Sequence, residues 1–409
     1  MSTNMKRFPI SGDRLLVALD VLLIAVRAYG LDLSIESEQN IFEPNSGPWC
    51  GGHAPSIVQT ADGTIIAAWR RDIDLVPNNE AWMATYKDGR WSQPRILATG
   101  SESGDDYTLE NVVLFQPKGG PLMLFYYTGP RPYFNRTNMW AGAMKTWGVI
   151  RTSTDNGQTW SPPRPLGNDP RLPGGRLCGP TKNPPIQLPD GSILIPSSNE
   201  PGAKDGEREA ALTLHFEKST DMGRTWSLVQ VLAPTPLRAI QPGFLVLGNG
   251  KLMALGRNEG RGNDTPMATS DDWGATWSNI SGLAALPQSH SGICPLTLSD
   301  GTHICILNTP VNPENPRDQL DLMVSTNGLD WTLGVTLNPA NDGKVANYPQ
   351  AVQTSDGKLH VVFTYANQMN AQNWRERVIR HVVLATGFES RHPSPEAWHD
   401  LKATPKPKP

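Results

Sequence analysis

The sequence predicts an all-β fold, a six-bladed β-propeller, and three observations indicate it. A box of the form Ser-x-Asp-x-Gly-x-Thr-Trp recurs at intervals of about fifty to seventy residues. Between the boxes, pairs of short apolar stretches recur, each pair joined by a turn that contains glycine. The composition, with 38 glycines and 37 prolines in 409 residues, suits many short strands, and no long amphipathic pattern indicates a helix.

Each box combines the residues that build a tight turn. Asp and Gly provide a left-handed backbone position, Ser and Thr side chains bond the turn backbone, and Trp fills the space beneath it. We therefore expect the boxes to be structural rather than catalytic. The complete copies are Ser153–Trp160, Ser219–Trp226 and Ser270–Trp277, and the degenerate copies are Ser325–Trp331 and Lys87–Trp91.

Six pairs of apolar stretches are predicted to be β-hairpins, because Asn-Gly and Asp-Gly supply the positive φ angles of type I′ turns. A box follows five of the six hairpins, so a hairpin and a boxed turn together supply the four strands of a blade. The box is then expected to join the third and fourth strands. The paired stretches are Ile57–Val58 with Ile65–Trp69, Val112–Phe115 with Leu122–Tyr126, Pro185–Leu188 with Ile193–Ile195, Phe244–Leu247 with Leu252–Leu255, Ile293–Leu298 with His303–Leu307, and Pro349–Val352 with Leu359–Phe363.

These units predict one propeller domain over residues 31–388. A seven-bladed ring is the less favoured alternative, in which residues 131–147 or 156–184 hold a weak blade. The segment Leu31–Ile41 is expected to add an outer strand to the last blade and so to close the ring. Residues 389–409, which end in Pro-Lys-Pro-Lys-Pro, are expected to form a disordered tail.

Residues 1–30 have the layout of a secretory signal peptide or a signal anchor, because basic residues precede the apolar run Leu15–Val26 and small residues follow it. The run is shorter than an ordinary membrane span, so we do not expect an integral membrane protein. A secreted, extracellular glycoprotein is the expectation. Three N-glycosylation sequons agree with it, at Asn135, Asn263 and Asn279.

The formal net charge of −3 leaves no general basic footprint, so a nucleic-acid partner is not expected. The four cysteines lack C-x-x-C spacing, and no other grouping has firm metal-ligand spacing, so neither a metal site nor a cofactor is predicted. A structural calcium ion in the axial channel stays open. So do the oligomeric state and the pairing of Cys294 with Cys305, which flank one hairpin and either face one another or remain free thiols.

Candidate site residues lie at the ends of the hairpins, because the innermost strands of a propeller converge on its axis. Apolar strands that end in His, Arg, Lys and Tyr are unusual in a dry core and indicate a polar, partly cationic cleft. The residues at these positions include His53, Arg70, Lys182, Asn183, Gln241, Arg257, His290 and Tyr348.

The boxes and the six-hairpin plan resemble the sialidase (neuraminidase) superfamily over roughly residues 47–385. The resemblance implies an enzyme that acts on an acidic sugar, holds the sugar carboxylate with three arginines and uses a Tyr nucleophile. By this resemblance Arg257 and Arg317 match two of the arginines and Tyr348 matches the nucleophile. Arg70, Arg71 and Asp72 stand where an additional arginine and the acid/base aspartate follow the first hairpin.

Two positions depart from the superfamily pattern. His53 replaces the first carboxylate-binding arginine, and Gln241 replaces the glutamate that takes the proton of the tyrosine. An unassisted phenol has a pKa of about 10 and attacks poorly at neutral pH, and an amide cannot act as its base. The loss of one arginine also weakens planar carboxylate recognition. Ordinary sialidase hydrolysis is therefore not the first expectation.

The remaining groups fit β-elimination from a uronic acid, as in the propeller lyases that the His-Ala-Pro opening at His53 resembles. The arginines would neutralise the carboxylate, His53 has an ordinary pKa of about 6.5 and suits proton transfer, and Tyr348 or Tyr127 would supply the complementary proton. Lys182, Asn183 and His290 are expected to help bind the substrate.

Two alternatives to the uronate lyase stay open. One is an exo-sialidase-type hydrolase that uses Tyr348 with another base, such as Glu259 or Glu200. The other is a glycan-binding propeller without catalytic activity. In all three cases the expected partner is an oligosaccharide or polysaccharide that bears an acidic sugar.

Overall fold

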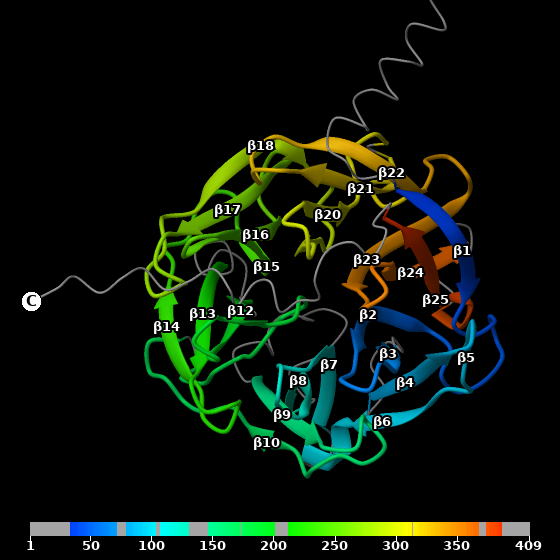
Figure 1. Cartoon of the computed structure of the whole chain (residues 1–409), viewed down its shortest axis with the longest axis horizontal. Coiled ribbons are helices and arrows are strands. Elements are labelled where there is room, and N and C mark those ends of the chain that lie inside the picture. The colour runs from blue at the N-terminus through cyan, green and yellow to red at the C-terminus, as the bar shows by residue number, and fades with distance from the viewer. Residues whose placement is uncertain are drawn as a thin grey trace, which may run out of the picture.

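The structure is a computed structural model that describes residues 33–71, 79–103, 107–130, 146–172, 174–200, 212–312, 314–367 and 374–386. These residues form six antiparallel sheets, and Figure 1 shows them as blades around a ring with their first strands toward the centre. The predicted all-β, six-bladed propeller is confirmed. In the described part of the chain, no helix is long and apolar enough to cross a membrane. The predicted leader (1–30) and tail (389–409) lie outside the described residues.

The first three blades follow one another along the chain, each from the axis outward. Blade 1 consists of β2 (Gly52–Gln59), β3 (Ile65–Arg71), β4 (Glu80–Lys87), β5 (Arg90–Trp91) and β6 (Arg95–Thr99), followed by the short 3-10 helix η1 (Gly100–Ser103). Blade 2 consists of β7 (Tyr107–Phe115), β8 (Leu122–Pro130), β9 (Trp147–Ser153) and β10 (Arg164–Pro165). Blade 3 consists of β11 (Ile186–Gln187), β12 (Ile193–Asn199), β13 (Thr213–Ser219) and β14 (Ser227–Val231).

The last three blades repeat this plan. Blade 4 consists of β15 (Ala239–Gly248), β16 (Lys251–Asn258), β17 (Asp264–Ser270) and β18 (Ser281–Pro287). Blade 5 consists of β19 (Cys294–Thr297), β20 (His303–Leu307), β21 (Leu320–Ser325) and β22 (Thr332–Asn338). Blade 6 consists of β23 (Lys344–Gln353), β24 (Leu359–Asn367), β25 (Val378–Ala385) and β1 (Ser34–Asn40), with the 3-10 helix η5 (Trp374–Glu376) before β25.

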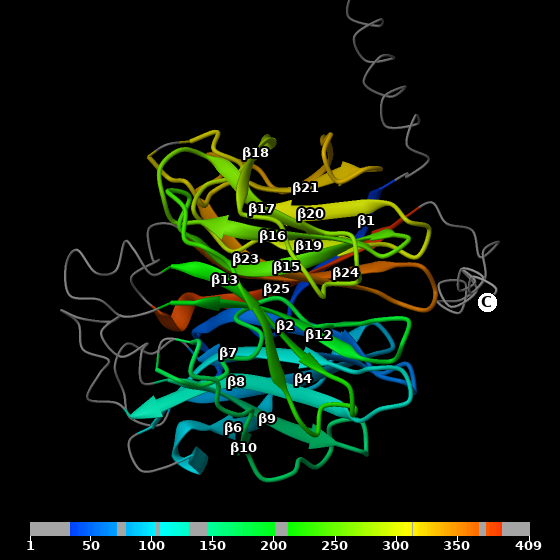
Figure 2. The same ribbon diagram turned by 90° about the vertical axis from the view of Figure 1, so that its left-hand side faces the viewer.

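Strand β1 closes the ring. It pairs antiparallel with β25, from Ser34 opposite Ala385 to Asn40 opposite Arg380, and lies at the outer edge of blade 6 (Figure 1). The expectation of an outer strand within Leu31–Ile41 is therefore confirmed. Seen from the side, the strands of all blades run between two faces of the ring (Figure 2). The described part of 156–184 adds only β10 and one isolated bridge, so it holds no seventh blade.

The boxes lie between the third and fourth strands, as predicted, and their contacts are those of a turn. In blade 2, Ser153 Oγ accepts the Gly157 N–H at 2.8 Å, and Asp155 accepts the Thr159 N–H at 2.9 Å and the Thr159 hydroxyl at 2.5 Å. Hydrogen bonds from Ser153 and Thr159 lower the pKa of Asp155 to about 2. The hydroxyl and carboxylate groups of Ser153, Asp155 and Thr159 are thus bonded to one another and to the box backbone, which supports a structural role.

The hairpin turns are of two kinds, so the prediction of type I′ geometry is wrong for the Asp-Gly turns. Asn249 and Gly250 both have positive φ, 52° and 84°, as a type I′ turn requires. At Asp62-Gly63 only Gly63 does, with φ of 86°, and its N–H donates to the Thr60 carbonyl at 2.8 Å. Asp62 instead accepts the Thr60 hydroxyl at 2.6 Å, and these bonds favour a type I turn followed by a left-handed glycine.

The core lies between neighbouring blades. Each main cluster joins apolar side chains of two adjacent sheets, as where Ile304 and Leu322 of blade 5 pack with Val361 and Leu384 of blade 6. Large side chains such as Trp69 are fully buried in these layers. The inner strands are therefore held from both sides, which fixes the positions of the residues at their axial ends.

Candidate active site

Four inner strands carry the same distortion near one end. In β2, β7, β15 and β23 the pairing with the second strand is interrupted by a bulge. The first bulged residue of each has a positive φ, which is uncommon for residues other than glycine and strains the backbone. These residues are Ala54 (48°), Asn111 (47°), Gln241 (51°) and Tyr348 (53°).

The residues before the bulges face equivalent positions on the second strands. His53 pairs with Arg70, Glu110 with Tyr127, Ile240 with Arg257, and Asn347 with Thr364. Six of the predicted site residues thus lie either at this register position or at the bulge itself, in different blades: His53, Arg70, Tyr127, Arg257, Gln241 and Tyr348. The backbone geometry repeats from blade to blade and places these residues at the same end of the inner strands. We call this region the axial zone, or axial site.

Tyr348 is the centre of this zone. Its ring lies 4.5 Å, centroid to centroid, from the ring of His53 in an edge-to-face contact. Arg257 Nη1 donates to the Tyr348 hydroxyl at 2.7 Å. The guanidinium carbons of Arg257 and Arg317 lie 5.8 and 5.6 Å from the Tyr348 ring centre. The structure therefore brings together His53, Tyr348, Arg257 and Arg317, as the sequence predicted.

The hydrogen bond from Arg257 determines that the Tyr348 hydroxyl oxygen acts as an acceptor. A guanidinium can only donate, so the Tyr348 oxygen accepts this bond and its own proton is left for another acceptor. A developing phenolate would keep the same charge-assisted bond. Tyr348 is thus arranged to give up a proton or to attack through oxygen.

The two arginines differ in their partners. Arg257 forms an ion pair with Glu259. Arg317 is largely buried, burial lowers its pKa, and its Nη2 donates to the His290 carbonyl at 3.4 Å. Among the described residues no carboxylate forms an ion pair with Arg317. Glu259 acts on Arg317 electrostatically but is ion-paired with Arg257, and a partly desolvated guanidinium favours the binding of an anionic ligand.

The two histidines of the site are held by polar neighbours. His53 Nδ1 lies 3.4 Å from Thr364 Oγ1, which also accepts the Ala54 N–H at 3.1 Å. His290 Nδ1 lies 2.9 Å from the Asn258 carbonyl oxygen, so this nitrogen carries a proton. The geometry gives His53 a fixed ring orientation against Tyr348, whereas His290 meets the cluster through its carbonyl and Arg317.

Arg70 and Arg71 are both ion-paired. Arg70, opposite His53, pairs with Glu110 of blade 2. Arg71 pairs with Glu80 at 2.9 Å within blade 1. Arg70 therefore belongs to the axial zone, and Arg71 is engaged within its own blade. Asp72 lies outside the described residues.

Lys182 and Asn183 are buried next to the axial zone and donate hydrogen bonds to backbone carbonyls of other blades. Lys182 Nζ, which is buried, donates to the carbonyls of Ile293 at 2.9 Å and Pro349 at 2.6 Å and to Asn183 Oδ1 at 3.3 Å. Burial lowers its pKa to about 8. Asn183 Nδ2 donates to the Gln241 carbonyl at 3.2 Å. These residues tie blades 3 to 6 together, and the three donors of Lys182 are all used internally, so we assign both a supporting position rather than substrate contact.

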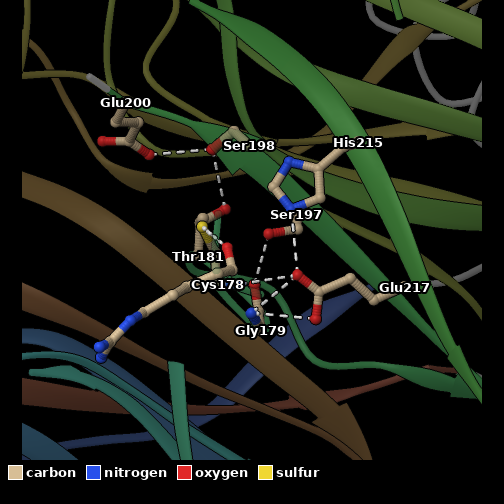
Figure 3. A network of polar contacts seen from close by, with 9 residues as sticks. Cys178, Gly179, Thr181, Ser197, Ser198, Glu200, His215 and Glu217 are labelled. Carbon is tan, nitrogen blue, oxygen red and sulfur yellow. Dashed lines mark hydrogen bonds and ion pairs between the residues drawn. The ribbon is translucent and has the colours of Figure 1, made fainter. Parts of the chain in front are cut away.

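Gln241 is buried, and its backbone is fixed more firmly than its side chain. Its N–H donates to Ser198 Oγ at 3.0 Å, while its side-chain oxygen has no hydrogen-bond partner among the described residues. Ser198 Oγ also donates to Glu200 at 2.9 Å (Figure 3). Glu200 is therefore the carboxylate that reaches the neighbourhood of Gln241 through one intervening hydroxyl.

Tyr127 borders a buried network in blade 3. Burial raises its pKa well above 10. In Figure 3 the contacts converge on Glu217, whose carboxylate accepts the N–H groups of Cys178 at 2.8 Å and Gly179 at 3.1 Å and meets His215 Nε2 at 3.0 Å. His215 and Glu217 are fully buried, which makes His215 a packed core residue. The network fixes the turn that leads to Lys182.

Comparison with known proteins assigns the fold to a family. The BNR repeat-like domain matches residues 55–361 of the chain. The chain belongs to this family. A sialidase of Bacteroides fragilis (strain YCH46) is 23% identical over 328 residues, which is 70% of this chain and 54% of the relative. This BNR-repeat protein therefore spans about half the length of that curated relative.

Solved structures share the propeller. A protein of unknown function from Dyadobacter fermentans superposes with a TM-score of 0.68 at 18% identity, covering 87% of this chain and 99% of the other. The NanB sialidase of Streptococcus pneumoniae superposes with a TM-score of 0.64 at 12% identity, covering 85% of this chain and 70% of the other. At these identities the likeness shows the fold alone, so the expected propeller fold is confirmed.

Sequence reasoning missed two members of the axial zone in this BNR-repeat protein. Glu110 and Asn111 precede the apolar stretch that predicted β7, and neither has the character of a strand residue. The available signal was their spacing: Glu110 and Asn111 lie as many residues before the turn Gly119-Gly120 as Asn347 and Tyr348 lie before the turn Asp356-Gly357. Only the common bulge makes this equivalence visible.

The described residues contain no group of three or more His, Cys, Asp or Glu side chains able to hold a metal ion. Cys50, Cys178, Cys294 and Cys305 are free thiols. Of the two alternatives for Cys294 and Cys305, the structure has the unpaired one: Cys294 lies opposite Ile306, and Cys305 lies opposite Pro295. The candidate chemistry thus rests on the side chains around Tyr348.

Proposed function

We propose that this BNR-repeat protein cleaves a glycosidic bond beside an acidic sugar by β-elimination, as a uronate lyase. The observation that carries the proposal is the arrangement of Tyr348, whose oxygen is bonded by Arg257 and whose ring contacts His53. Gln241 stands where hydrolysis through a tyrosine would need a carboxylate base. An acid and a base are therefore adjacent, and the usual activator of a nucleophilic tyrosine is missing.

The sugar carboxylate is recognised by the arginines. Arg317 has no ion-pair partner among the described residues, and the guanidinium carbons of Arg257 and Arg317 both lie within 6 Å of the Tyr348 ring centre, at 5.8 and 5.6 Å. Neutralisation of the carboxylate makes the proton on the adjacent C5 atom more acidic, because the charge of the resulting carbanion spreads onto the carboxylate. Binding and activation of the substrate are thus one step.

The elimination then needs one base and one acid. His53 takes the C5 proton, a double bond forms between C4 and C5, and the bond from C4 to the leaving oxygen breaks. Tyr348 donates its proton to that oxygen, and Arg257 stabilises the phenolate. Transfer of the proton from His53 to Tyr348, whose rings touch, restores the resting state, and no water is consumed.

A second candidate function is sialoside hydrolysis with Tyr348 as the nucleophile. It is favoured by the relatives named as sialidases and by two carboxylates near the site. Glu259 pairs with Arg257, and Glu200 reaches the Gln241 backbone through Ser198. Either carboxylate would have to replace the missing base.

The products distinguish the two reactions. Elimination leaves an unsaturated uronate that absorbs in the ultraviolet, and hydrolysis of a sialoside reporter leaves no such chromophore. We expect the purified protein to produce the chromophore from oligosaccharides in which a sugar is linked to O4 of a glucuronate, and we expect His53→Gln and Tyr348→Phe each to lower kcat at least a hundredfold. His360→Gln, in β24 next to the Asp356-Gly357 turn rather than at the end that faces Asn347, is the matched control and should retain kcat. Release of sialic acid that survives His53→Gln but not Tyr348→Phe would refute the elimination and support the hydrolase.

We also propose that the protein is secreted as a glycoprotein. Asn263 and Asn279 are exposed, as glycan acceptors must be, whereas Asn135 lies outside the described residues. Protein secreted from a eukaryotic cell should lose mass on treatment with an endoglycosidase, and this loss should shrink in the Asn263→Gln and Asn279→Gln variants. A chain retained in the cytosol without glycans would contradict the proposal.

A further inference from the structure

Asn111 occupies the same structural position in blade 2 as Tyr348 does in blade 6. Both are the first residue of a bulge in the inner strand, and their φ angles are 47° and 53°. The strands that carry them, β7 and β23, flank β2 of blade 1 in the ring (Figure 1). The fold therefore presents Asn111 to the same zone as the proposed acid.

The side chain of Asn111 is not used by the protein. It is half-buried, and no described residue donates a hydrogen bond to its amide or accepts one from it. The repeated bulge accounts for the positive φ, which asparagine tolerates, but it does not use the hydrogen-bonding groups of the amide, and these remain for a ligand. By contrast Asn249, which also has a positive φ, lies in a type I′ turn that favours asparagine.

The neighbours of Asn111 connect it to the proposed chemistry. The preceding residue, Glu110, pairs with Arg70, and Arg70 lies opposite His53. Blade 1, between blades 2 and 6, presents only the methyl group of Ala54 at the equivalent bulge. A ligand bound against His53 and Tyr348 would thus have Asn111 as its neighbour on the blade 2 side.

We propose that Asn111 is a substrate-binding residue whose amide bonds two hydroxyl groups of the acidic sugar. This inference rests on the proposed function of the axial site. The amide is neutral and cannot compete with Arg257 and Arg317 for the carboxylate. It donates and accepts at once, which matches neighbouring hydroxyl groups, each of which can do the same. Asn111 thereby selects the orientation of the ring, while the arginines select its charge.

The variants separate the amide from the backbone. Asn111→Gly removes the amide and tolerates a positive φ, so the bulge is preserved. Asn111→Asp keeps the shape and the tolerance of positive φ, but it replaces the donor with a negative charge. Asn249→Gly is the matched control, because it changes an asparagine of similar φ in a turn. Thermal unfolding of each variant shows that the fold is intact.

The experiment measures binding of D-glucuronic acid by calorimetry, together with KM and kcat for the chromophore-forming reaction. We expect about tenfold weaker binding and a similar rise in KM for Asn111→Gly, with kcat changed less, and a larger loss for Asn111→Asp. A purely structural role would not make the aspartate variant the worse of the two. Asn249→Gly should bind as the unmodified protein does.

The outcomes also separate this inference from the proposed function. If the unmodified protein binds glucuronic acid and both Asn111 variants bind it equally well, the role of Asn111 is refuted and the axial site stands. If the unmodified protein binds the acid but yields no chromophore, the elimination is refuted, and the binding data still decide the role of Asn111. If the unmodified protein binds no glucuronic acid, both proposals are overturned.

Discussion

Acid should unfold this propeller through a buried histidine at the junction of blades 6 and 1. Trp91 Nε1 donates to His381 Nδ1 at 3.1 Å, and His381 Nε2 lies 3.0 Å from His360 Nδ1. An indole N–H can only donate, so His381 Nδ1 is the acceptor and its proton sits on Nε2. Protonation of His381 would place N–H against N–H and break the bond with Trp91.

The loss of unfolding free energy at acid pH follows from the burial of His381. Only 1% of His381 is exposed, and burial, with His360 as the lesser cause, lowers its pKa from 6.5 to about 3. The unfolded chain therefore binds one more proton than the folded chain between these values. This contribution to stability is fully present above pH 6.5 and falls as the pH drops toward 3. The loss is about 1.4 kcal/mol at pH 5.5 and about 2.7 kcal/mol at pH 4.5.

The assay is urea denaturation at several values of pH between 4.5 and 7.5. Unfolding free energy should fall by at least these amounts, because burial also lowers the pKa of His303 and His360. The box carboxylates Asp155 and Asp221 titrate near 2 and contribute only at lower pH. In His381→Gln, which keeps the donor to His360, the slope between pH 4.5 and 6.5 should be smaller by about one proton. An identical slope in the variant would refute the assignment of this proton uptake to His381.

Three further changes test the site and its support. Arg317→Lys should raise KM for an acidic sugar at least tenfold with little change in melting temperature, because a lysine cannot bind a carboxylate in two places; an unchanged KM would exclude it from the carboxylate site. Lys182→Met should lower the unfolding free energy by about 3 kcal/mol in urea denaturation, because it removes the donor from the buried carbonyls of Ile293 and Pro349; a neutral result would contradict the supporting role of Lys182. Ser153→Ala should cost about 1 kcal/mol of stability and leave kcat unchanged, since its contacts stay within the box; a loss of kcat without a loss of stability would give the box a catalytic part.

The fold was predictable because turns depend on local chemistry. The box at Ser153–Trp160 needs its Asp, Gly and hydroxyl groups at fixed offsets, and these offsets are visible in the sequence. Turn type was less predictable: Asp62 is held at negative φ by its bonds to Thr60 and Thr64, which compete with the type I′ geometry that its dipeptide favours.

The candidate site was predictable only in part. His53, Arg257 and Tyr348 stand out because each is polar and ends an apolar strand. The supporting position of Lys182 depends on carbonyl groups more than a hundred residues away in the chain, and no local pattern encodes them. Asn111 and Glu110 were missed because their relevance comes from a bulge that repeats between blades rather than from their own residue types.

Strand β1, which closes the ring, determines how late in folding the candidate site assembles. His53 belongs to blade 1 and Tyr348 to blade 6, so the pair straddles the junction that β1 holds shut against β25. Contacts between such distant parts of a chain form late, because a long loop must close first. A folding intermediate with five finished blades would have much of the native secondary structure and no assembled acid–base pair. Recovery of activity after dilution from urea should therefore lag behind recovery of the β-sheet signal in circular dichroism. The rate at which activity returns would then report the rate at which blades 1 and 6 come together.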